Sequence, residues 1–298
     1  MRLYACPGNE PFSDLLAREL GAAQGRVSWH RFPDRETLVR IETPPQGEGV
    51  ALVCALADPD PKLLPLLFAA EALREQGARQ VGLVAPYLAY MRQDTRFHPG
   101  ETVSARHFGS LLARHFDWLV TVDPHLHRLA SLSQVFPKPN RAAQAAPALA
   151  EWIRAEARDP LLIGPDAESA QWVSAVAQHC GAPWTHLTKE RLGDREVRVS
   201  LPDADRWRGR QAVLVDDIVS TGETMVAAAR RLKELGFAAP LCVAVHGLFA
   251  EGARQALLQA GVARIAVTNS VPQPDSLIDV APPVAAALRT LLAAARSA

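Results

Sequence analysis

The sequence predicts an α/β fold with two tandem domains, each a mostly parallel sheet flanked by helices. Three observations support this prediction. Short apolar segments alternate with helical ones, the alternation restarts after a proline-rich break at residues 137–140, and 298 residues suit two domains of about 150 each. We therefore expect domains over residues 1–145 and 146–283, with a helix over 284–298 that packs back on the first domain.

The first half alternates between strand and helix signals. Strands are expected at residues 1–6, 38–41, 50–56, 81–86 and 118–122, and helices at 11–20, 63–76 and 104–115. Gly21 ends the first of these helices. Because helices separate most of the strands, we expect βαβ units and parallel pairing.

The second half repeats this order after the break. Strands are expected at residues 161–164, 184–187, 213–215, 241–246 and 264–268. Helices are expected at residues 148–157, 225–235, 251–260 and, after the break at Pro282-Pro283, 284–295. The highly charged segment 188–196 is interpreted as a hairpin between strands.

Composition excludes several classes of protein. A hydrophobic fraction of 48% and a charged fraction of 21% are typical of a globular protein, and a formal net charge of zero argues against nucleic acid or an anionic membrane as partner. No apolar run reaches the ~18 residues of a membrane span, and no signal peptide opens the chain. The cysteines form no CxxC pair, so we expect buried reduced thiols in a cytoplasmic protein. They are Cys6, Cys54, Cys180 and Cys242.

The segment 213–224 carries the strongest functional signal. An apolar run ends in Asp216 and Asp217, passes through a turn at Gly222, and opens into a helix. Free N–H groups at a helix N-terminus favour an anion, and the hydroxyls of this turn add donors. Two carboxylates suit sugar hydroxyls or hydrated Mg²⁺, so a phosphorylated sugar with a metal fits the whole segment. The alternative is an acidic strand end whose hydroxyls only cap the helix.

A second candidate site follows the strand at 81–86. Arg92, Arg96 and His98 crowd one loop, which costs repulsion unless an anion neutralises them. Arginine also presents a planar fork suited to phosphate oxygens. A solvated basic loop is the alternative.

Four further segments carry weaker signals. Asp123 and His125 end a strand and can share a metal-bound water or a phosphate oxygen, and Asp166 ends another strand as a lone acid. The turn Phe32–Glu36 can hold a purine, with stacking on the ring and carboxylates accepting from the amine. The hairpin 188–196 can close two cations over a phosphoryl group. For Asp123 and His125 the alternative is a helix cap and a surface histidine, and for Asp166 it is a helix N-cap. For the turn Phe32–Glu36 it is a solvated hairpin, and for residues 188–196 a plain surface hairpin.

Taken in order, over nearly the whole chain, these segments resemble the ribose-phosphate pyrophosphokinase family, which makes 5-phosphoribosyl 1-pyrophosphate (PRPP). The matching segments are 32–36, 90–97, 121–125, 165–166, 189–191 and 216–224. The turn Ser220–Gly222 is similar to the archaeal-like class, which phosphate does not activate. The resemblance implies two type I phosphoribosyltransferase-like domains. It also implies transfer of a diphosphoryl group from ATP to the 1-hydroxyl of ribose 5-phosphate, with Mg²⁺.

The resemblance also implies roles for individual residues. Lys189 and Arg191 are expected to be catalytic, and His125, Asp123 and Asp166 to bind metal. The expected ATP-binding residues are Phe32, Asp34, Glu36, Arg92, Gln93, Asp94 and Arg96. The expected ribose 5-phosphate-binding residues are Asp216, Asp217, Ser220, Thr221, Gly222, Glu223 and Thr224. Binding of adenine across an interface implies a homodimer or a higher homo-oligomer.

Other functions are weighed against this one. Arg35 stands where the family usually has Gly, and Glu168 and Glu223 stand where small residues are usual. The departures at Arg35 and Glu168 leave open a catalytically impaired regulatory homologue. A transferase that consumes PRPP needs one such domain and has no use for the loops at Arg92 and Lys189 together. A nicotinamide-binding Rossmann protein is excluded, since no GxGxxG follows a predicted strand.

Overall fold

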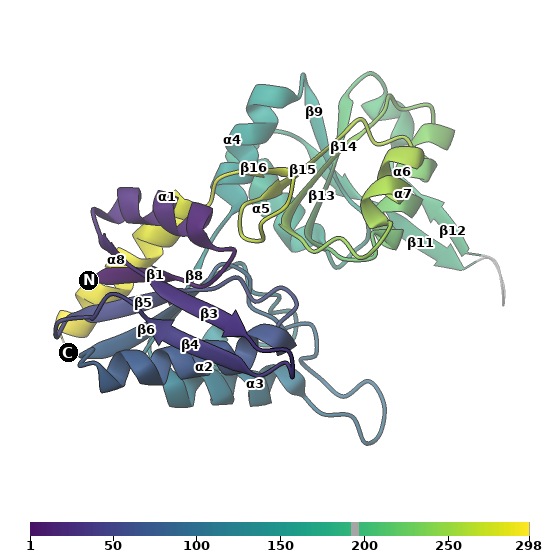
Figure 1. The fold of residues 1–298 in the computed structure, drawn as a ribbon. Helices are drawn as coiled ribbons and strands as arrows, with labels where there is room; N and C mark the ends of the chain where they lie inside the picture. The colour runs from purple at the N-terminus through teal and green to yellow at the C-terminus, as the bar shows by residue number, and fades with distance from the viewer. Residues whose placement is uncertain (192–196, 298) are drawn as a thin grey trace. The chain divides into compact units, whose positions relative to one another are not determined.

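The computed structural model describes residues 1–191 and 197–297; for 189–191, 197–199 and 295–297 it describes the backbone alone. The chain divides into two compact units, Met1–Gln144 with Val280–Ala298 and Ala145–Asp279 (Figure 1). Each unit is an α/β structure built on a six-stranded sheet.

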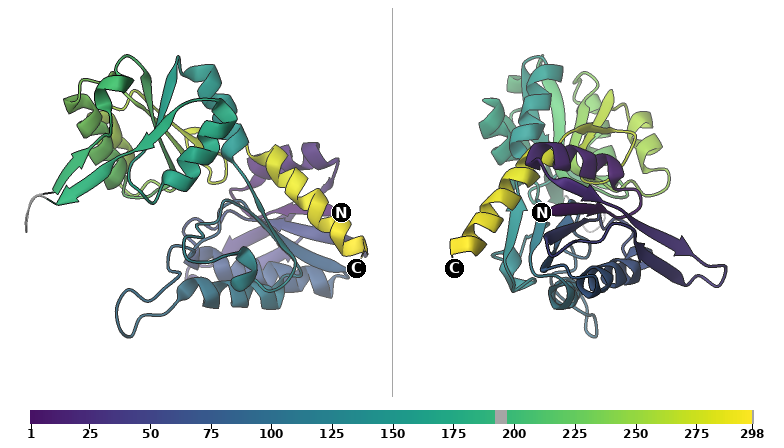
Figure 2. Two further views of the ribbon diagram at one scale, coloured as in Figure 1. Left: turned by 180° about the vertical axis from the view of Figure 1, so that it is seen from behind. Right: turned by 60° about the vertical axis from the view of Figure 1, so that its left-hand side comes forward.

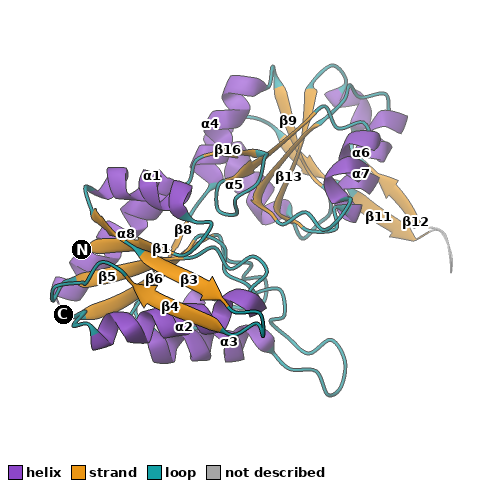
Figure 3. Ribbon diagram, in the orientation of Figure 1, coloured by secondary structure: helices purple, strands orange, loops and turns teal. Residues whose placement is uncertain are grey.

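The sheet of the first unit has the strand order β2-β1-β5-β6-β7-β8, and every pair in it is parallel. Its strands are β1 (Arg2–Ala5), β2 (Ala23–Gly25), β5 (Gly49–Val53), β6 (Gln80–Ala85), β7 (Leu119–Val122) and β8 (Asn140–Ala143). Helices α1 (Glu10–Leu20) and α8 (Ala281–Ser297) cover one face, and α2 (Asp60–Glu75) and α3 (Ser104–His115) cover the other (Figure 3). The fold class predicted from the alternation is confirmed here.

Local sequence explains these elements. Most of β5 and β6 is buried, and apart from Gln80 these strands consist of apolar residues and glycine, as expected of central strands with helices on both faces. Helix α1 ends at Gly21, whose φ of 61° is a left-handed conformation that glycine adopts without a Cβ penalty. Helix α8 packs against α1, β7 and β8, which places both termini in this unit (Figure 2).

The second unit repeats the same topology, with the strand order β10-β9-β13-β14-β15-β16 and only parallel pairs. Its strands are β9 (Pro160–Gly164), β10 (Trp184–His186), β13 (Gln211–Val219), β14 (Leu241–Gly247), β15 (Arg264–Thr268) and β16 (Ser276–Ile278). Its helices are α4 (Ala146–Glu156), α5 (Ala170–Cys180), α6 (Glu223–Glu234) and α7 (Ala253–Gln259). An apolar core joins α6 and α7 to one face of the sheet.

Each unit carries an antiparallel hairpin between the second and third strands of its sheet. In the first unit the hairpin is β3 (Val27–Arg31) with β4 (Thr37–Ile41), and in the second it is β11 (Thr188–Arg191) with β12 (Val197–Ser200). The two hairpins therefore occupy equivalent places in a duplicated fold.

The structure also corrects several expected boundaries. Strand β13 does not end at Asp216 and Asp217 but continues to Val219, because it pairs with β14 as far as Gly247. The short edge strands β2, β8 and β16 were not predicted, since their few residues carry no clear period. Pro282-Pro283 is not a break: both residues lie in the first turn of α8, where no N–H is needed.

Cys6, Cys54 and Cys242 are buried and free, as predicted, whereas Cys180 at the end of α5 is only partly buried. Within the described residues, no helix is long and apolar enough to cross a membrane.

The packing of Gly82 in β6 gives a first prediction. A Cβ at this position would lie 1.9 Å from the Trp118 ring, inside a sheet covered on both faces. We expect Gly82→Ala to lower the free energy of unfolding by about 2 kcal/mol, because the backbone or the indole must shift. Urea unfolding measures this change. The control is Gly49→Ala, since nothing lies within 4 Å of a Cβ there; equal effects of the two substitutions would contradict the packing argument.

Candidate active site

The strand order of the second unit reverses direction between β9 and β13, since the chain first steps from β9 out to β10 and then crosses to the other side. At such a switch point, the loops beyond the carboxyl ends of the strands leave a crevice that binds ligands in α/β proteins. Asp166 follows β9, and Asp216 and Asp217 lie near the end of β13. The structure thus brings together acids that lie 50 positions apart in the sequence.

The charge of Asp216 is destabilised in this crevice. Burial, together with the neighbouring carboxylates of Asp217 and Asp166, raises the pKa of Asp216 to about 8, while the N–H of Asp217 opposes this rise. Asp217 is itself only 4% exposed, and its N–H donates to Oδ1 of Asp216 over 3.0 Å. A cation or hydroxyl donors from a ligand would offset this cluster of negative charge. The donor set of hard oxygens therefore fits a divalent metal.

Asp166 organises its own turn. Its Oδ1 accepts from the N–H groups of Glu168 over 3.0 Å and Ser169 over 3.2 Å, and the Ser169 hydroxyl donates to the Asp166 carbonyl over 2.6 Å. These bonds close the turn before α5 and do not cap the helix, whose N-cap is Ser169 with no side-chain cap hydrogen bond. The carboxylate of Asp166 also acts on Asp216. Glu168, the unusual acid, is exposed.

The turn after β13 is shaped for an anion. Gly222 is buried with φ of 76°, and it precedes α6 as the N-cap. No side chain caps this helix. The alternative interpretation, in which the hydroxyls of Ser220, Thr221 and Thr224 only cap the helix, is therefore not supported. Among the described residues, no hydrogen bond involves the N–H groups of residues 222–225, the four donors that a helix N-terminus leaves open. These donors lie at the positive end of the helix dipole, where an anion is favoured.

The equivalent crevice of the first unit is closed by the protein itself. Asn9, only 4% exposed, accepts from the N–H of Ala55 over 2.7 Å and donates to the Cys6 carbonyl over 3.2 Å. Lys62 donates to the carbonyls of Ala55 and Ala57 over 3.0 and 2.5 Å. Side chains of this unit thus satisfy groups that a ligand meets in the second unit.

The predicted phosphate loop of the first unit leaves β6. Arg92, Gln93 and Arg96 are exposed there. Glu101 shapes the loop, because its Oε2 accepts from the N–H of Phe97 over 2.8 Å and its carbonyl accepts from Arg96 Nε over 2.9 Å. Glu101 was not predicted as part of the loop, and it offsets part of the repulsion expected among the cations.

Two buried or strained residues hold the start of this loop. Tyr90 has φ of 66°, unusual outside glycine, and its hydroxyl donates to the Asp60 carboxylate while its ring contacts Phe108. The side chain of Asp94 is 1% exposed and pairs with Arg128. Asp94 therefore presents no open surface to a nucleotide in this structure, unlike Arg92.

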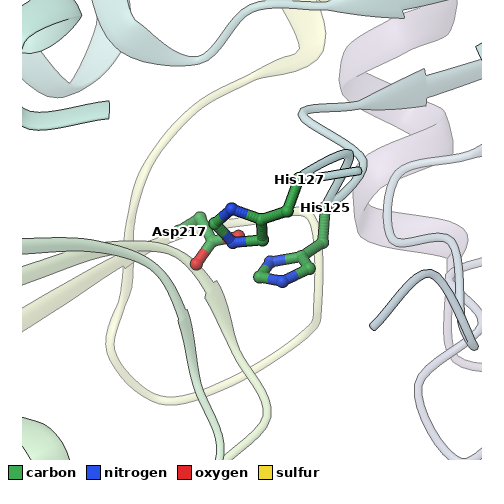
Figure 4. A group of neighbouring side chains, drawn as sticks. All are labelled: His125, His127 and Asp217. Atoms are coloured by element: carbon green, nitrogen blue, oxygen red, sulfur yellow. The ribbon is translucent and has the colours of Figure 1, made fainter. Parts of the chain in front are cut away.

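The segment after β7 carries two histidines. The imidazole rings of His125 and His127 lie edge to face, with centroids 4.0 Å apart and planes at 71° (Figure 4). Asp123 has φ of 30°, and its N–H donates to the Ala143 carbonyl over 3.0 Å. His127 was not among the predicted ligands, although its two-residue spacing from His125 was the available signal. Imidazole is a common metal ligand, so this segment also fits a metal.

The hairpin β3–β4 carries the predicted purine turn. Phe32 is 41% exposed, its N–H donates to the Glu36 carbonyl over 2.8 Å, and Arg35 adopts φ of 75°. This left-handed backbone explains why glycine suits the position and shows that arginine is accommodated. A cavity of about 610 Å³ lies between the hairpin and α2. Asp34, Glu36 and Phe68 are among its lining residues.

Lys189 and Arg191, the predicted catalytic cations, lie on strand β11. Their side chains fall outside the described part of the structure.

Comparison with known proteins identifies the family to which this chain belongs. Residues 1–115 match the family model described as the N-terminal domain of ribose phosphate pyrophosphokinase, and residues 131–274 match the phosphoribosyl transferase domain. A ribose-phosphate pyrophosphokinase of Methanopyrus kandleri is 39% identical over 93% of this chain and 94% of that protein. The chain belongs to the ribose-phosphate pyrophosphokinase family.

Other members of the family agree in length and fold. The ribose-phosphate pyrophosphokinase of Thermococcus kodakarensis is 36% identical over 92% of this chain and 96% of that protein. The crystal structure of phosphoribosylpyrophosphate synthetase from Mycobacterium smegmatis has a TM-score of 0.82 and 25% identity, covering 100% of this chain and 99% of that one. The resemblance recognised from the six sequence segments is confirmed.

The acid cluster predicts how stability changes with pH. Because the pKa of Asp216 in the folded state, about 8, lies above the ordinary aspartate value of 3.8, the folded state keeps a proton that the unfolded chain releases. The contribution of this retained proton to the stability of the folded state is fully present below pH 3.8 and is lost as the pH rises through about 8. We expect Asp216→Asn to raise the melting temperature at pH 8 in the absence of metal, with little effect near pH 4. Calorimetry measures both.

The matched control is Asp203→Asn, which removes an exposed carboxylate from the same unit. A gain for Asp216→Asn that is equal at both pH values, or a loss at pH 8, would contradict the electrostatic account.

Proposed function

We propose that this chain is a ribose-phosphate diphosphokinase, which transfers the diphosphoryl group of ATP to the 1-hydroxyl of ribose 5-phosphate and releases AMP and PRPP. The turn Ser220–Thr224 beneath the carboxylates of Asp216 and Asp217 carries the proposal, because it offers phosphate donors and sugar acceptors in one crevice. Family membership supplies the reaction.

Ribose 5-phosphate binds to the second unit. Its phosphate accepts from the open N–H groups at the start of α6 and from the hydroxyls of Ser220, Thr221 and Thr224. The ribose hydroxyls donate to Asp216 and Asp217, which stabilises their charge in a crevice where burial opposes it. Glu223 is exposed at the first position of α6, so its carboxylate lies beside the phosphate site without filling it.

ATP binds to the first unit. Arg92, Gln93 and Arg96 are exposed on the loop after β6 and contact the phosphates. Phe32, Asp34 and Glu36 bind adenine through the ring and the carboxylates. The adenine-binding turn is supplied by a second copy of the chain.

An apolar surface supports this homodimer. The side chains of Leu38, Leu64 and Phe68, on β4 and α2, are 52%, 60% and 51% exposed. Contiguous apolar exposure of this kind is typical of a surface that another chain covers.

The metal is Mg²⁺. Each unit carries proposed metal ligands, His125 and Asp123 in the first unit and Asp166 in the second. When bound, Mg²⁺ neutralises charge on the diphosphoryl oxygens. The oxygen-rich crevice around Asp216 suits this hard cation, which prefers carboxylate and water ligands.

The chain's own cations complete the reaction. The 1-hydroxyl attacks the β-phosphorus, its proton leaves to solvent, and the bond from the β-phosphorus to the α-phosphate oxygen breaks to give AMP. Lys189 and Arg191 of β11 stabilise the charge that spreads over the phosphoryl oxygens. Positioning and electrostatics supply most of the catalysis, as in other phosphoryl transfers.

The activity is tested by measuring AMP released from ATP and Mg²⁺, with and without ribose 5-phosphate, at low and high inorganic phosphate. We expect AMP formation to require the sugar, with PRPP formed in equal amount and no stimulation by phosphate. Binding of ribose 5-phosphate by calorimetry without any AMP release would favour the regulatory homologue. Replacement of Mg²⁺ by Ca²⁺ tests the metal assignment, because Ca²⁺ takes more and longer oxygen contacts.

Lys189→Ala tests the catalytic cations. We expect kcat to fall about 100-fold or more, because one charge on the transition state is lost, while ribose 5-phosphate still binds with unchanged affinity. Lys233→Ala, an exposed lysine on α6, is the matched control. A Lys189→Ala variant with full kcat would contradict the proposal that Lys189 of β11 stabilises the transition state.

A further inference from the structure

We propose that the ion pair between the buried Asp94 and the partly exposed Arg128 is a positioning device, which holds the segment carrying His125 beside the loop carrying Arg92 and Gln93. The inference rests on the proposed function, because it assigns both segments to one ATP-binding site. It changes the role expected of Asp94 from contacting ATP to orienting the groups that do.

The pair joins two segments that lie 34 positions apart in the sequence. Arg128 Nη1 donates to Asp94 Oδ1 over 3.1 Å, and the backbone N–H of Arg128 donates to Asp94 Oδ2 over 3.2 Å. Both carboxylate oxygens are therefore occupied by one residue. One of the two bonds goes to the backbone, so it fixes the path of the chain three residues after His125 and not only a side chain.

Burial separates the role of Asp94 from that of its neighbours. The Asp94 side chain is 1% exposed, whereas Arg92 and Gln93 are exposed. A buried carboxylate keeps its charge only with partners that compensate for lost hydration. Arg128 provides this compensation while remaining 53% exposed itself. Asp94 is placed to hold Arg128 and not to reach a nucleotide.

The segment 123–128 needs such a contact, because it forms no helix or strand. At its start, the Asp123 N–H donates to the Ala143 carbonyl of β8 over 3.0 Å. At its end, Asp94 holds Arg128, and Leu129 beyond is buried. His125 and His127 lie between these two fixed points. The Arg128 guanidinium also lies 5.6 Å from the centre of the Phe97 ring, which adds a second contact to the same loop.

Rigid placement of these segments has a chemical consequence. Phosphate contacts from Arg92 and metal contacts from His125 act on one triphosphate, so their separation must be held constant for both to form together. Loss of the pair would weaken both contacts to ATP and leave the ribose 5-phosphate crevice of the second unit intact. Second-layer contacts of this kind typically change metal affinity or activity by about 10–100-fold.

The test is a double-mutant cycle with Asp94→Asn, Arg128→Met and the double variant, in the full-length chain with Mg²⁺. Each single substitution should lower kcat/KM for ATP about tenfold or more while the KM for ribose 5-phosphate stays unchanged. The double variant should be no worse than the poorer single one, since the two residues act as a unit. Additive losses, or an unchanged kcat/KM for ATP in either single variant, would overturn the proposal.

Arg74 and Asp117 provide the matched control at the opposite end of the same sheet. Arg74 Nη2 donates to Asp117 Oδ2 over 3.0 Å, and the Val81 N–H donates to the same oxygen over 2.8 Å. Arg74→Met should lower the melting temperature and leave the KM for ATP unchanged. A rise in that KM equal to the rise in Arg128→Met would show general loosening of the unit and overturn the positioning role.

Folding and function are separated by two further measurements. Arg128→Lys keeps the charge and the backbone N–H, so it should recover part of the kcat/KM that Arg128→Met loses; no recovery, in a protein that binds ribose 5-phosphate normally, contradicts the pairing. If the unaltered chain forms no PRPP, the proposed function fails. The pair is then judged by calorimetry of Mg²⁺ and ATP binding, where Asp94→Asn must weaken ATP affinity.

Discussion

Burial of negative charge at the switch point of the second unit is the constraint on which the site depends. Asp216 lies on a strand with sheet neighbours on both sides, so it cannot move away from Asp217 or Asp166. Folding therefore places carboxylates where their ionisation is opposed. A ligand with hydroxyls and a cation relieves this cost, so the same electrostatics that lower the stability of the free protein favour binding.

Duplication of one topology shows how the two units come to differ. Both have six parallel strands with an antiparallel hairpin in the same place. In the first unit, Asn9 and Lys62 make hydrogen bonds to backbone groups at the crevice that is equivalent to that of the second unit. The residues proposed to contact the ATP phosphates instead follow β6, and the proposed metal ligands of this unit follow β7. The two units therefore differ in which strand ends carry open polar groups.

Much of this arrangement could be predicted from the sequence, because periodicity records burial. The central strands and helix α3 were found, since uniform apolar runs and a clear helical period leave few alternatives. Edge strands such as β8 were missed, because half of their residues face away from the core. The acids at Asp216 were recognised as a site, but their strand was ended too early, since a carboxylate in a strand interior is rare without a ligand to stabilise it.

The pairing of side chains from distant segments could not be predicted from sequence periodicity. Asp94 stands in a motif between Gln93 and Thr95, and nothing in that motif shows that its carboxylate turns inward to Arg128. The sequence does not distinguish an exposed aspartate from a buried one. Only the fold separates a side chain that can contact a ligand from one that orients its neighbours. The strained backbones of Tyr90 and Asp123 support this distinction, because left-handed φ values outside glycine persist only where surrounding contacts hold them. Both lie shortly before the two paired residues, so the proposed positioning role would act on backbone that is already held in place.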